Sequence, residues 1–367
     1  MVTLLDQPIK VKKIDKSDML GHLTKTPDHC LDAVNRARQV KVPEKVKPKN
    51  IIIAGMGGSA IGGEILQDWL REELPIPVEV CKDYVLPAYA NEDTLFFANS
   101  YSGNTEETLT AFVEAIRRKC IAITITSGGY LLSFSKKLQV PHVAIPSQLP
   151  SRVAIPYLFF PLPVLLERMG ILSSREEDIE ETIQILKKVG EENSPEIPTE
   201  NNVAKKLALE LVDTIPVVYG FRQYGAIARR LKTQFNENSK VLSKYDVFPE
   251  LNHNETVGWE APEALTKNYS VILIRDPNEP PEIRHRIEAT KSLALHKAKK
   301  ILEIHAKGDG KLAKMFSVLR VGDFASVYLA ILQRVDPTPV KIIDRIKVGM
   351  KKGFDMTEKL QAEIQKL

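Results

Sequence analysis

Residues 51–63 read IIIAGMGGSAIGG, and this stretch decides the fold. Residues 51–54 are all apolar, which is typical of a strand that is buried on both faces of a sheet. A glycine-rich turn follows at once, and the helical pattern EILQDWLREEL begins at residue 64. A buried strand, a glycine turn and a helix make half of a βαβ unit, so the sequence predicts an α/β protein with parallel sheets.

The same cycle recurs along the chain. In the first half, further strands are predicted at 78–84, 94–100, 121–126 and 141–146, and in the second half at 217–220, 270–275 and 300–306. The stretch FASVYLAILQRV at 324–335 predicts a helix. A length of 367 residues suits about two domains. We therefore expect α/β domains at 50–172 and 201–347, a lead-in helix within 1–49, a linker at 173–200 and a charged helical tail at 348–367 that lies on the surface at a dimer contact.

Composition narrows the class of protein. Basic residues number 51 and acidic residues 47, and this excess is too small for a nucleic-acid partner. Three cysteines without CxxC spacing favour neither a disulfide framework nor a metal site. The longest apolar stretch, residues 155–166, is interrupted by prolines and shorter than the roughly 20 residues that span a membrane. The start of the chain lacks the apolar core of a signal peptide. We expect a cytoplasmic protein with no membrane contact.

The turn GMGGS has the features of an anion site, because a glycine turn that enters a helix presents free N–H groups at the positive end of the helix dipole. Its spacing departs from the dinucleotide fingerprint, since Ala60 stands where the last glycine or alanine belongs. Taken alone, the turn suits a dinucleotide, another phosphate or simple tight packing about equally.

A second polar turn, SYSGNTEET at 100–108, follows the next buried strand. Ligands of open α/β sheets gather at the carboxyl ends of strands. Hydroxyl groups with helix N–H groups and without a lysine describe a pocket for a small phosphate monoester, whereas a nucleoside triphosphate site would carry GKS or GKT. Alternatively, serine and threonine here only cap the helix. The whole cluster beside GMGGS favours the phosphate pocket.

These two turns together resemble the sugar isomerase (SIS) domain. With PSRVAIPYLFFPL at 150–162, FNENSK at 235–240 and FPELNHNETVGWE at 248–260, the chain resembles the bifunctional phosphoglucose/phosphomannose isomerase family from about residue 45 to residue 347. The resemblance implies two flavodoxin-like, three-layer αβα SIS domains with parallel sheets and a homodimer. It also implies an aldose–ketose isomerase that acts on a phosphorylated hexose without metal or organic cofactor.

The resemblance also implies roles for single residues. Glu237 matches the base that moves a proton between C1 and C2, and His253 matches the acid–base that opens the sugar ring. Arg152 matches the arginine that stabilises the enediolate, and Lys347 matches a lysine that assists ring opening, although Lys341 is a rival. The phosphate is expected on residues of the two turns, namely Gly57, Gly58, Ser59, Ser100, Ser102 and Thr105. The site is expected in the crevice between the domains.

Three other interpretations compete with this one. The isomerase half of glucosamine-6-phosphate synthase would follow an N-terminal cysteine nucleophile, which the start MVT does not offer. A SIS-type sugar-phosphate sensor, or an isomerase for another phosphosugar, would keep the serine turns; the presence of both Glu237 and His253 favours catalysis. The sequence departs from the family pattern in its long tail after Lys347, and in Pro156 and Pro163, which interrupt the helix expected after PSR.

Overall fold

The computed structural model describes residues 3–353 and 356–365. They form two compact units, and unit 1 comprises Met1–Pro27 and Glu177–Pro339, whereas unit 2 comprises Asp28–Glu176 and Val340–Leu367. This grouping differs from the expected boundaries, because each unit is built from two separate parts of the chain. Residues 1–2 of the expected lead-in and residues 354–355 and 366–367 of the expected tail lie outside the described residues.

Unit 2 contains a parallel sheet of five strands in the order β2-β1-β3-β4-β5. Its strands are β1 (Asn50–Ala54), β2 (Val78–Cys81), β3 (Thr94–Ser100), β4 (Ile121–Thr126) and β5 (His142–Ala144). This order is that of flavodoxin-like folds, in which the strand order reverses between the first and third strands. The predicted fold class is therefore confirmed for this half of the chain.

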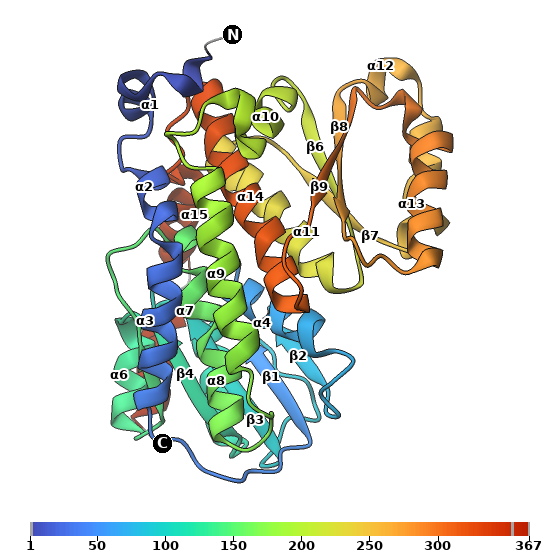
Figure 1. The fold of residues 1–367 in the computed structure, drawn as a ribbon. Coiled ribbons are helices and arrows are strands. Elements are labelled where there is room, and N and C mark those ends of the chain that lie inside the picture. Colours follow the sequence, from blue (N-terminus) through green and yellow to red (C-terminus); the bar gives the residue numbers. More distant parts are fainter. Residues whose placement is uncertain (1–2, 354–355, 366–367) are drawn as a thin grey trace. The chain divides into compact units, whose positions relative to one another are not determined.

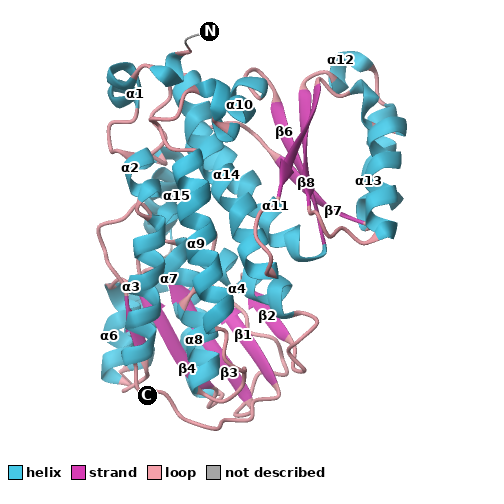
Figure 2. Ribbon diagram, viewed as in Figure 1, coloured by secondary structure: helices cyan, strands magenta, loops and turns pink. Residues whose placement is uncertain are grey.

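Helices cover both faces of that sheet (Figures 1 and 2). The helices of this unit are α3 (Thr26–Gln39), α4 (Gly58–Leu70), α5 (Glu106–Arg117), α6 (Gly129–Lys137), α7 (Ile155–Phe159), α8 (Pro161–Arg168), α15 (Lys341–Gly353) and α16 (Met356–Ile364). Residues 341–350 of α15 are exposed, so α15 does not form part of either layer. Successive side chains of a strand point to opposite faces. Ile52 accordingly packs with Phe112 of α5, whereas Ile53 lies against Gly63 of α4.

The region after PSR and the tail differ from expectation. Pro156 and Pro161 stand in the first turns of α7 and α8, so prolines start two short helices where one interrupted helix was expected. The tail is not only a charged surface helix: Leu360 and Ile364 of α16 are buried in the core of unit 2. Lys137 Nζ donates to the Ile364 carbonyl at 2.9 Å. These contacts hold the end of the described chain against α5 and α6.

Unit 1 contains a second parallel sheet, with four strands in the order β7-β6-β8-β9. The strands are β6 (Ile215–Phe221), β7 (Lys244–Phe248), β8 (Tyr269–Arg275) and β9 (Lys300–His305), and the helices are α1 (Pro8–Ile14), α2 (Met19–Thr24), α9 (Glu176–Glu192), α10 (Val203–Glu210), α11 (Gly225–Gln234), α12 (Glu263–Thr266), α13 (Pro281–Leu293) and α14 (Lys311–Leu332). Strand β7 was not predicted from the sequence. The segment 173–200, whose acidic sequence is typical of a surface helix before a proline-marked linker, contains α9, and Ile179, Leu186 and Val189 of this helix are buried.

The two faces of the unit 1 sheet carry different segments. A Cβ on Gly220 of β6 would meet Ala228 of α11, so this face is covered by α11 and α14. The neighbouring Tyr219 points to the other face, where its hydroxyl donates to Glu255 at 3.1 Å. Residues 249–266 and α13 cover that second face (Figure 1). Both units are thus three-layer αβα structures.

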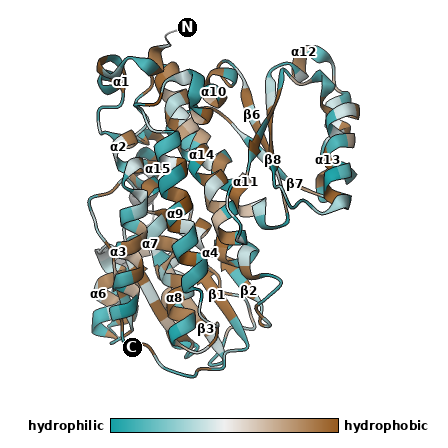
Figure 3. Cartoon of the chain, viewed as in Figure 1, coloured by the Kyte–Doolittle hydropathy of each residue, from teal (hydrophilic) through white to brown (hydrophobic). Residues whose placement is uncertain are grey.

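Helix α14 is the core helix of unit 1. It packs against α2, α10, α11 and β9, and nearly all of its residues are buried. It is longer than the predicted 324–335 helix. It is also the one helix among the described residues with the length and composition to cross a membrane, but 94% of its apolar window is buried inside the protein. Figure 3 shows hydrophobic residues along much of this helix, with hydrophilic ones between them.

Candidate functional site

The two predicted polar turns lie side by side at the carboxyl edge of the unit 2 sheet. The first follows β1 and the second follows β3, and these two strands are neighbours. The strand order reverses between them, and open α/β sheets bind ligands at such a switch point. Helices α4 and α5 start from these turns, so their N-termini add positive partial charge at the same edge.

The first turn is shaped by Gly57. Its φ is +53°, a left-handed conformation that glycine adopts without strain, and a Cβ built on it would have no atom within 4 Å. Ser59, in the first turn of α4, is buried and its Oγ accepts a hydrogen bond from Tyr101 N–H at 3.2 Å. The first turn therefore leaves open space above Gly57 and is joined to the second turn through Ser59.

The second turn is held by its own hydroxyl groups. Ser100 Oγ lies 3.0 Å from Thr105 Oγ1 and accepts the N–H of Gly103 at 3.1 Å. Ser102 is exposed, and its Oγ accepts the N–H of Asn104 at 3.2 Å. Hydroxyl and amide groups without a fixed charge thus line this turn, which suits a phosphate held by many weak donors.

A third turn, which sequence reasoning missed, supports the second. Residues 127–129 follow β4 as Ser-Gly-Gly. Ser127 Oγ donates to the Tyr101 carbonyl at 2.6 Å, and Tyr130 N–H donates to Asn104 Oδ1 at 3.0 Å. Polar residues and glycines directly after a buried strand are the same signal that identified the first two turns, and it was available in the sequence.

Arg152 belongs to the same region of unit 2. It lies in the short 3₁₀ turn Ser151–Val153 and is 4% exposed. Leu149 N–H donates to the Tyr101 hydroxyl at 2.8 Å, and the Ser151 carbonyl is 3.6 Å from a Cβ built on Gly58. The PSR segment therefore lies beside both phosphate-type turns, as its predicted role requires.

Lys347 and Lys341 both lie on α15 and both are exposed. The apolar side chains Ile342, Ile343, Ile346 and Met350 recur at intervals of three and four residues, so they share one face of this helix. Lys347 stands four residues after Ile343 and three before Met350, at the border of that face, whereas Lys341 lies farther round the helix. Among residues 3–353 and 356–365, no hydrogen bond or ion pair joins either lysine to the turns.

Glu237 lies on an unusual turn in unit 1. Helix α11 ends at Gln234, and Phe235–Ser239 continue it as a single π-turn, a wider helical turn that is frequent at functional sites. Glu237 is half-buried. Lys240 closes the turn in the left-handed conformation, with φ at +58°, and its Nζ donates to the carbonyls of Glu237 and Pro337.

His253 lies in a different layer of unit 1. It ends the 3₁₀ helix Glu250–His253 and is exposed. Its neighbour Asn252 donates through Nδ2 to Thr290 of α13 at 2.7 Å, which places this segment on the Tyr219 face of the sheet. The Glu237 turn packs against α14 on the opposite face. Within unit 1, the structure does not bring Glu237 and His253 together.

The switch point of the unit 1 sheet differs from that of unit 2. Tyr224 follows β6 and donates its hydroxyl to Asp276, which follows β8, at 2.5 Å. Lys314 Nζ lies 3.4 Å from the same carboxylate, and all three side chains are buried. Burial, together with the Asp276 hydrogen bond, raises the pKa of Tyr224 well above its usual value. The buried side chains of Tyr224, Asp276 and Lys314 therefore fill the switch point of the unit 1 sheet, whereas glycine turns leave the switch point of unit 2 open.

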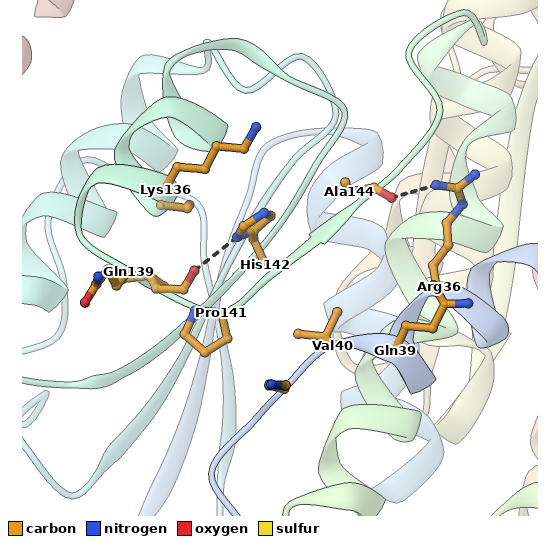
Figure 4. Close-up of a pocket in the computed structure, with 11 residues that line it drawn as sticks. Arg36, Gln39, Val40, Lys136, Gln139, Pro141, His142 and Ala144 are labelled. Atoms are coloured by element: carbon orange, nitrogen blue, oxygen red, sulfur yellow. Dashed lines mark hydrogen bonds between the residues drawn. The ribbon is translucent and has the colours of Figure 1, made fainter.

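A hollow of about 590 Å³ also lies in unit 2, between α3, α6 and β5 (Figure 4). Lys136 and Gln139 line it at the end of α6, and His142 lines it at the start of β5. Helix ends and strand starts meet at the amino edge of a parallel sheet, opposite the glycine turns. This hollow is therefore separate from the candidate phosphate site.

Comparisons with known proteins agree with this geometry. Residues 200–350 match the family model described as the bacterial phospho-glucose isomerase C-terminal SIS domain. The bifunctional phosphoglucose/phosphomannose isomerase of Caldicellulosiruptor bescii is 40% identical over 323 residues, 88% of this chain and 95% of its own. The protein of the same name from Thermoplasma acidophilum is 37% identical over 300 residues, 81% of this chain and 88% of its own.

Among solved structures, a hypothetical protein from Thermus thermophilus matches with a TM-score of 0.74 at 15% identity, covering 95% of this chain and 94% of that one. At this identity the match shows a shared fold only.

Proposed function

Because the chain belongs to the bifunctional phosphoglucose/phosphomannose isomerase family, we propose that it interconverts glucose 6-phosphate or mannose 6-phosphate with fructose 6-phosphate through a cis-enediol. The observation that carries the proposal is the pair of glycine and serine turns at the switch point of unit 2, with open space above Gly57. Such a site suits the phosphate that all three sugars share.

Each step of the reaction has a candidate residue. Gly57, Gly58, Ser59, Ser100, Ser102 and Thr105 would hold the phosphate. Glu237 would take the proton from C2 of the open-chain aldose and return it to C1, as general bases do. The Arg152 guanidinium would stabilise the enediolate charge. His253 and Lys347 would transfer the protons that open and close the ring.

A coupled assay with both aldose phosphates tests the proposal. We expect fructose 6-phosphate to form from glucose 6-phosphate and from mannose 6-phosphate. Binding of these sugars without turnover would instead support a SIS-type sugar-phosphate sensor, and turnover of a different phosphosugar alone would support another isomerase. Phosphorylated hexoses carry charge that keeps them from crossing a bilayer, so the cytoplasm is the compartment proposed for this activity.

Replacing Ser102 by alanine tests the phosphate assignment. We expect KM to rise about tenfold while kcat changes less than KM, because a phosphate contact is equally strong in the ground state and the transition state. Ser292→Ala, which removes an exposed serine hydroxyl from α13, is the control and leaves both constants unchanged. A loss confined to kcat would contradict a phosphate-binding role for Ser102.

We also propose that the active form is a homodimer. Glu237 and His253 lie in layers on opposite faces of the unit 1 sheet, so a site that uses both residues is completed more simply by His253 of a second copy.

Complementation tests the dimer. Glu237→Gln and His253→Ala are each expected to be inactive alone. After the two variants are mixed and their subunits exchange, each mixed dimer has one intact site, and about a quarter of wild-type activity is expected for random pairing. Wild-type protein mixed with itself under the same conditions controls for losses on exchange. No recovery of activity despite proven exchange would show that both residues act within one chain.

A further inference from the structure

The core helix α14 carries a buried polar cluster beneath the Glu237 turn. Asp323 is 3% exposed and Ser326 is fully buried, although nearly all of their neighbours on the helix are apolar. Burying polar groups of this kind costs free energy unless they are hydrogen-bonded. Their hydrogen-bond partners therefore show which part of the structure they support.

Asp323 holds the last turn of α11. Arg230 donates to its carboxylate through Nε at 3.2 Å and through Nη2 at 3.0 Å, and Gln234 Nε2 donates to Oδ1 at 2.9 Å. Arg230 and Gln234 are each 1% exposed. A buried ion pair adds little stability over apolar residues of the same volume, but separating its partners leaves a buried charge uncompensated and is strongly destabilising, so the joined groups stay together. Asp323 thereby holds Gln234, the residue directly before the π-turn.

Ser326 holds the π-turn itself. Asn238 Nδ2 donates to Ser326 Oγ at 2.9 Å, and Ser239 Oγ donates to the Ser326 carbonyl at 2.6 Å. Ser326 Oγ in turn donates to the Asp323 carbonyl at 2.8 Å. Asn238 and Ser239 are each 1% exposed. The two residues that follow Glu237 are therefore tied to one position on α14.

We propose that Ser326 and Asp323 are positioning residues that set the location of the Glu237 carboxylate, an inference that rests on the proposed role of Glu237 as the base. The turn is held before Glu237 through Gln234 and after it through Asn238, Ser239 and Lys240. Neither α14 residue touches the substrate in this assignment. Both act only through the turn, and a proton transfer is sensitive to such placement.

Ser326→Ala is the main test, with Ser317→Ala as the matched control. Ser317 lies on the same helix, is 1% exposed and also makes two hydrogen bonds, with the Lys307 amide and the Lys314 carbonyl. We expect Ser326→Ala to lower kcat about tenfold with KM within about twofold, since misplacing a reacting group by about 1 Å costs up to about 100-fold. Ser317→Ala is expected to keep both constants.

A kinetic isotope effect separates positioning from stability. With glucose 6-phosphate deuterated at C2, a misplaced base makes proton abstraction slower and more fully rate-limiting, so the isotope effect on kcat rises in Ser326→Ala and not in Ser317→Ala. Melting temperatures of both variants are measured alongside. A fall in kcat that only tracks the folded fraction, with an unchanged isotope effect, would overturn the inference.

Asn238→Ala provides a second variant if Ser326→Ala folds poorly, because it leaves the Ser326 hydroxyl bonded to the Asp323 carbonyl. It is expected to reproduce the loss in kcat, and the double variant is expected to lose no more than either single variant. Glu237→Gln distinguishes failure of the proposed function from failure of the positioning role alone. If Glu237→Gln stays active, the role of Glu237 fails and the inference fails with it. If Glu237→Gln is inactive while Ser326→Ala and Asn238→Ala keep normal kcat and isotope effects, only the inference fails.

Discussion

Replacing Glu237 by glutamine is expected to lower the isomerisation rate by roughly a thousandfold, within the range of about 10²–10⁴ that a general base contributes. Glutamine keeps the size of the side chain and its position on the π-turn, but its amide does not accept the C2 proton. Binding of 6-phosphogluconate is expected to stay nearly unchanged, because the phosphate turns belong to unit 2. The measurements are the coupled assay and a calorimetric titration with 6-phosphogluconate.

Glu210→Gln is the control for that experiment. It removes an exposed carboxylate from an ion pair with Lys300 in the same unit, and surface ion pairs contribute little. We expect normal turnover in this variant. Near-normal turnover in Glu237→Gln as well would remove Glu237 from the mechanism and leave the family's proton transfer without its proposed base.

Replacing Gly103 by alanine is expected to cost about 3 kcal/mol or more of the free energy of unfolding of unit 2. Gly103 has a φ of +68°, and a Cβ built on it would lie 1.8 Å from the Gly128 carbonyl oxygen. The left-handed conformation alone costs about 1–2 kcal/mol for a residue with a Cβ. The clash adds to this, because backbone of the neighbouring turn must move. Denaturant unfolding of the isolated variant and the wild type measures the loss.

Gly57→Ala is the matched control for Gly103→Ala. Gly57 has a similar φ of +53° but a ψ of −121° and no atom within 4 Å of its Cβ position, so a conformational cost of about 1–3 kcal/mol without a clash is expected. Its added methyl group enters the space proposed for the phosphate, and KM should therefore rise. Equal destabilisation by the two variants would show that the Gly103–Gly128 contact relaxes without cost.

Much of the fold could be predicted from the sequence. Mostly apolar runs located β1, β3, β4 and β8, because strands buried on both faces of a sheet are rich in apolar residues. Strand β7 was missed for the same reason: it lies at the sheet edge, with Lys244 and Tyr245 exposed, and it has no apolar run. The start of α14 was missed because a helix buried all round has no apolar stripe to reveal its period.

Contacts between distant residues were beyond sequence reasoning. The tail was expected to be a surface helix because its composition is charged, yet Leu360 and Ile364 are buried in the core of unit 2. The residues that hold the Glu237 turn, Asp323 and Ser326, have no motif of their own and look like isolated polar residues on an apolar helix.

The sequence by itself determined the glycine turns, the hydroxyl cluster of the second turn and the parallel α/β class, because each depends on residues that are close in the chain. Only the tertiary structure decided which distant residues lie close together and which lie apart. It placed Glu237 and His253 on opposite faces of one sheet, and it brought Ser326 to Asn238, 88 residues away in the chain. Packing across a core depends on shape and on hydrogen-bond partners between distant segments, and a local pattern of residue types does not encode either.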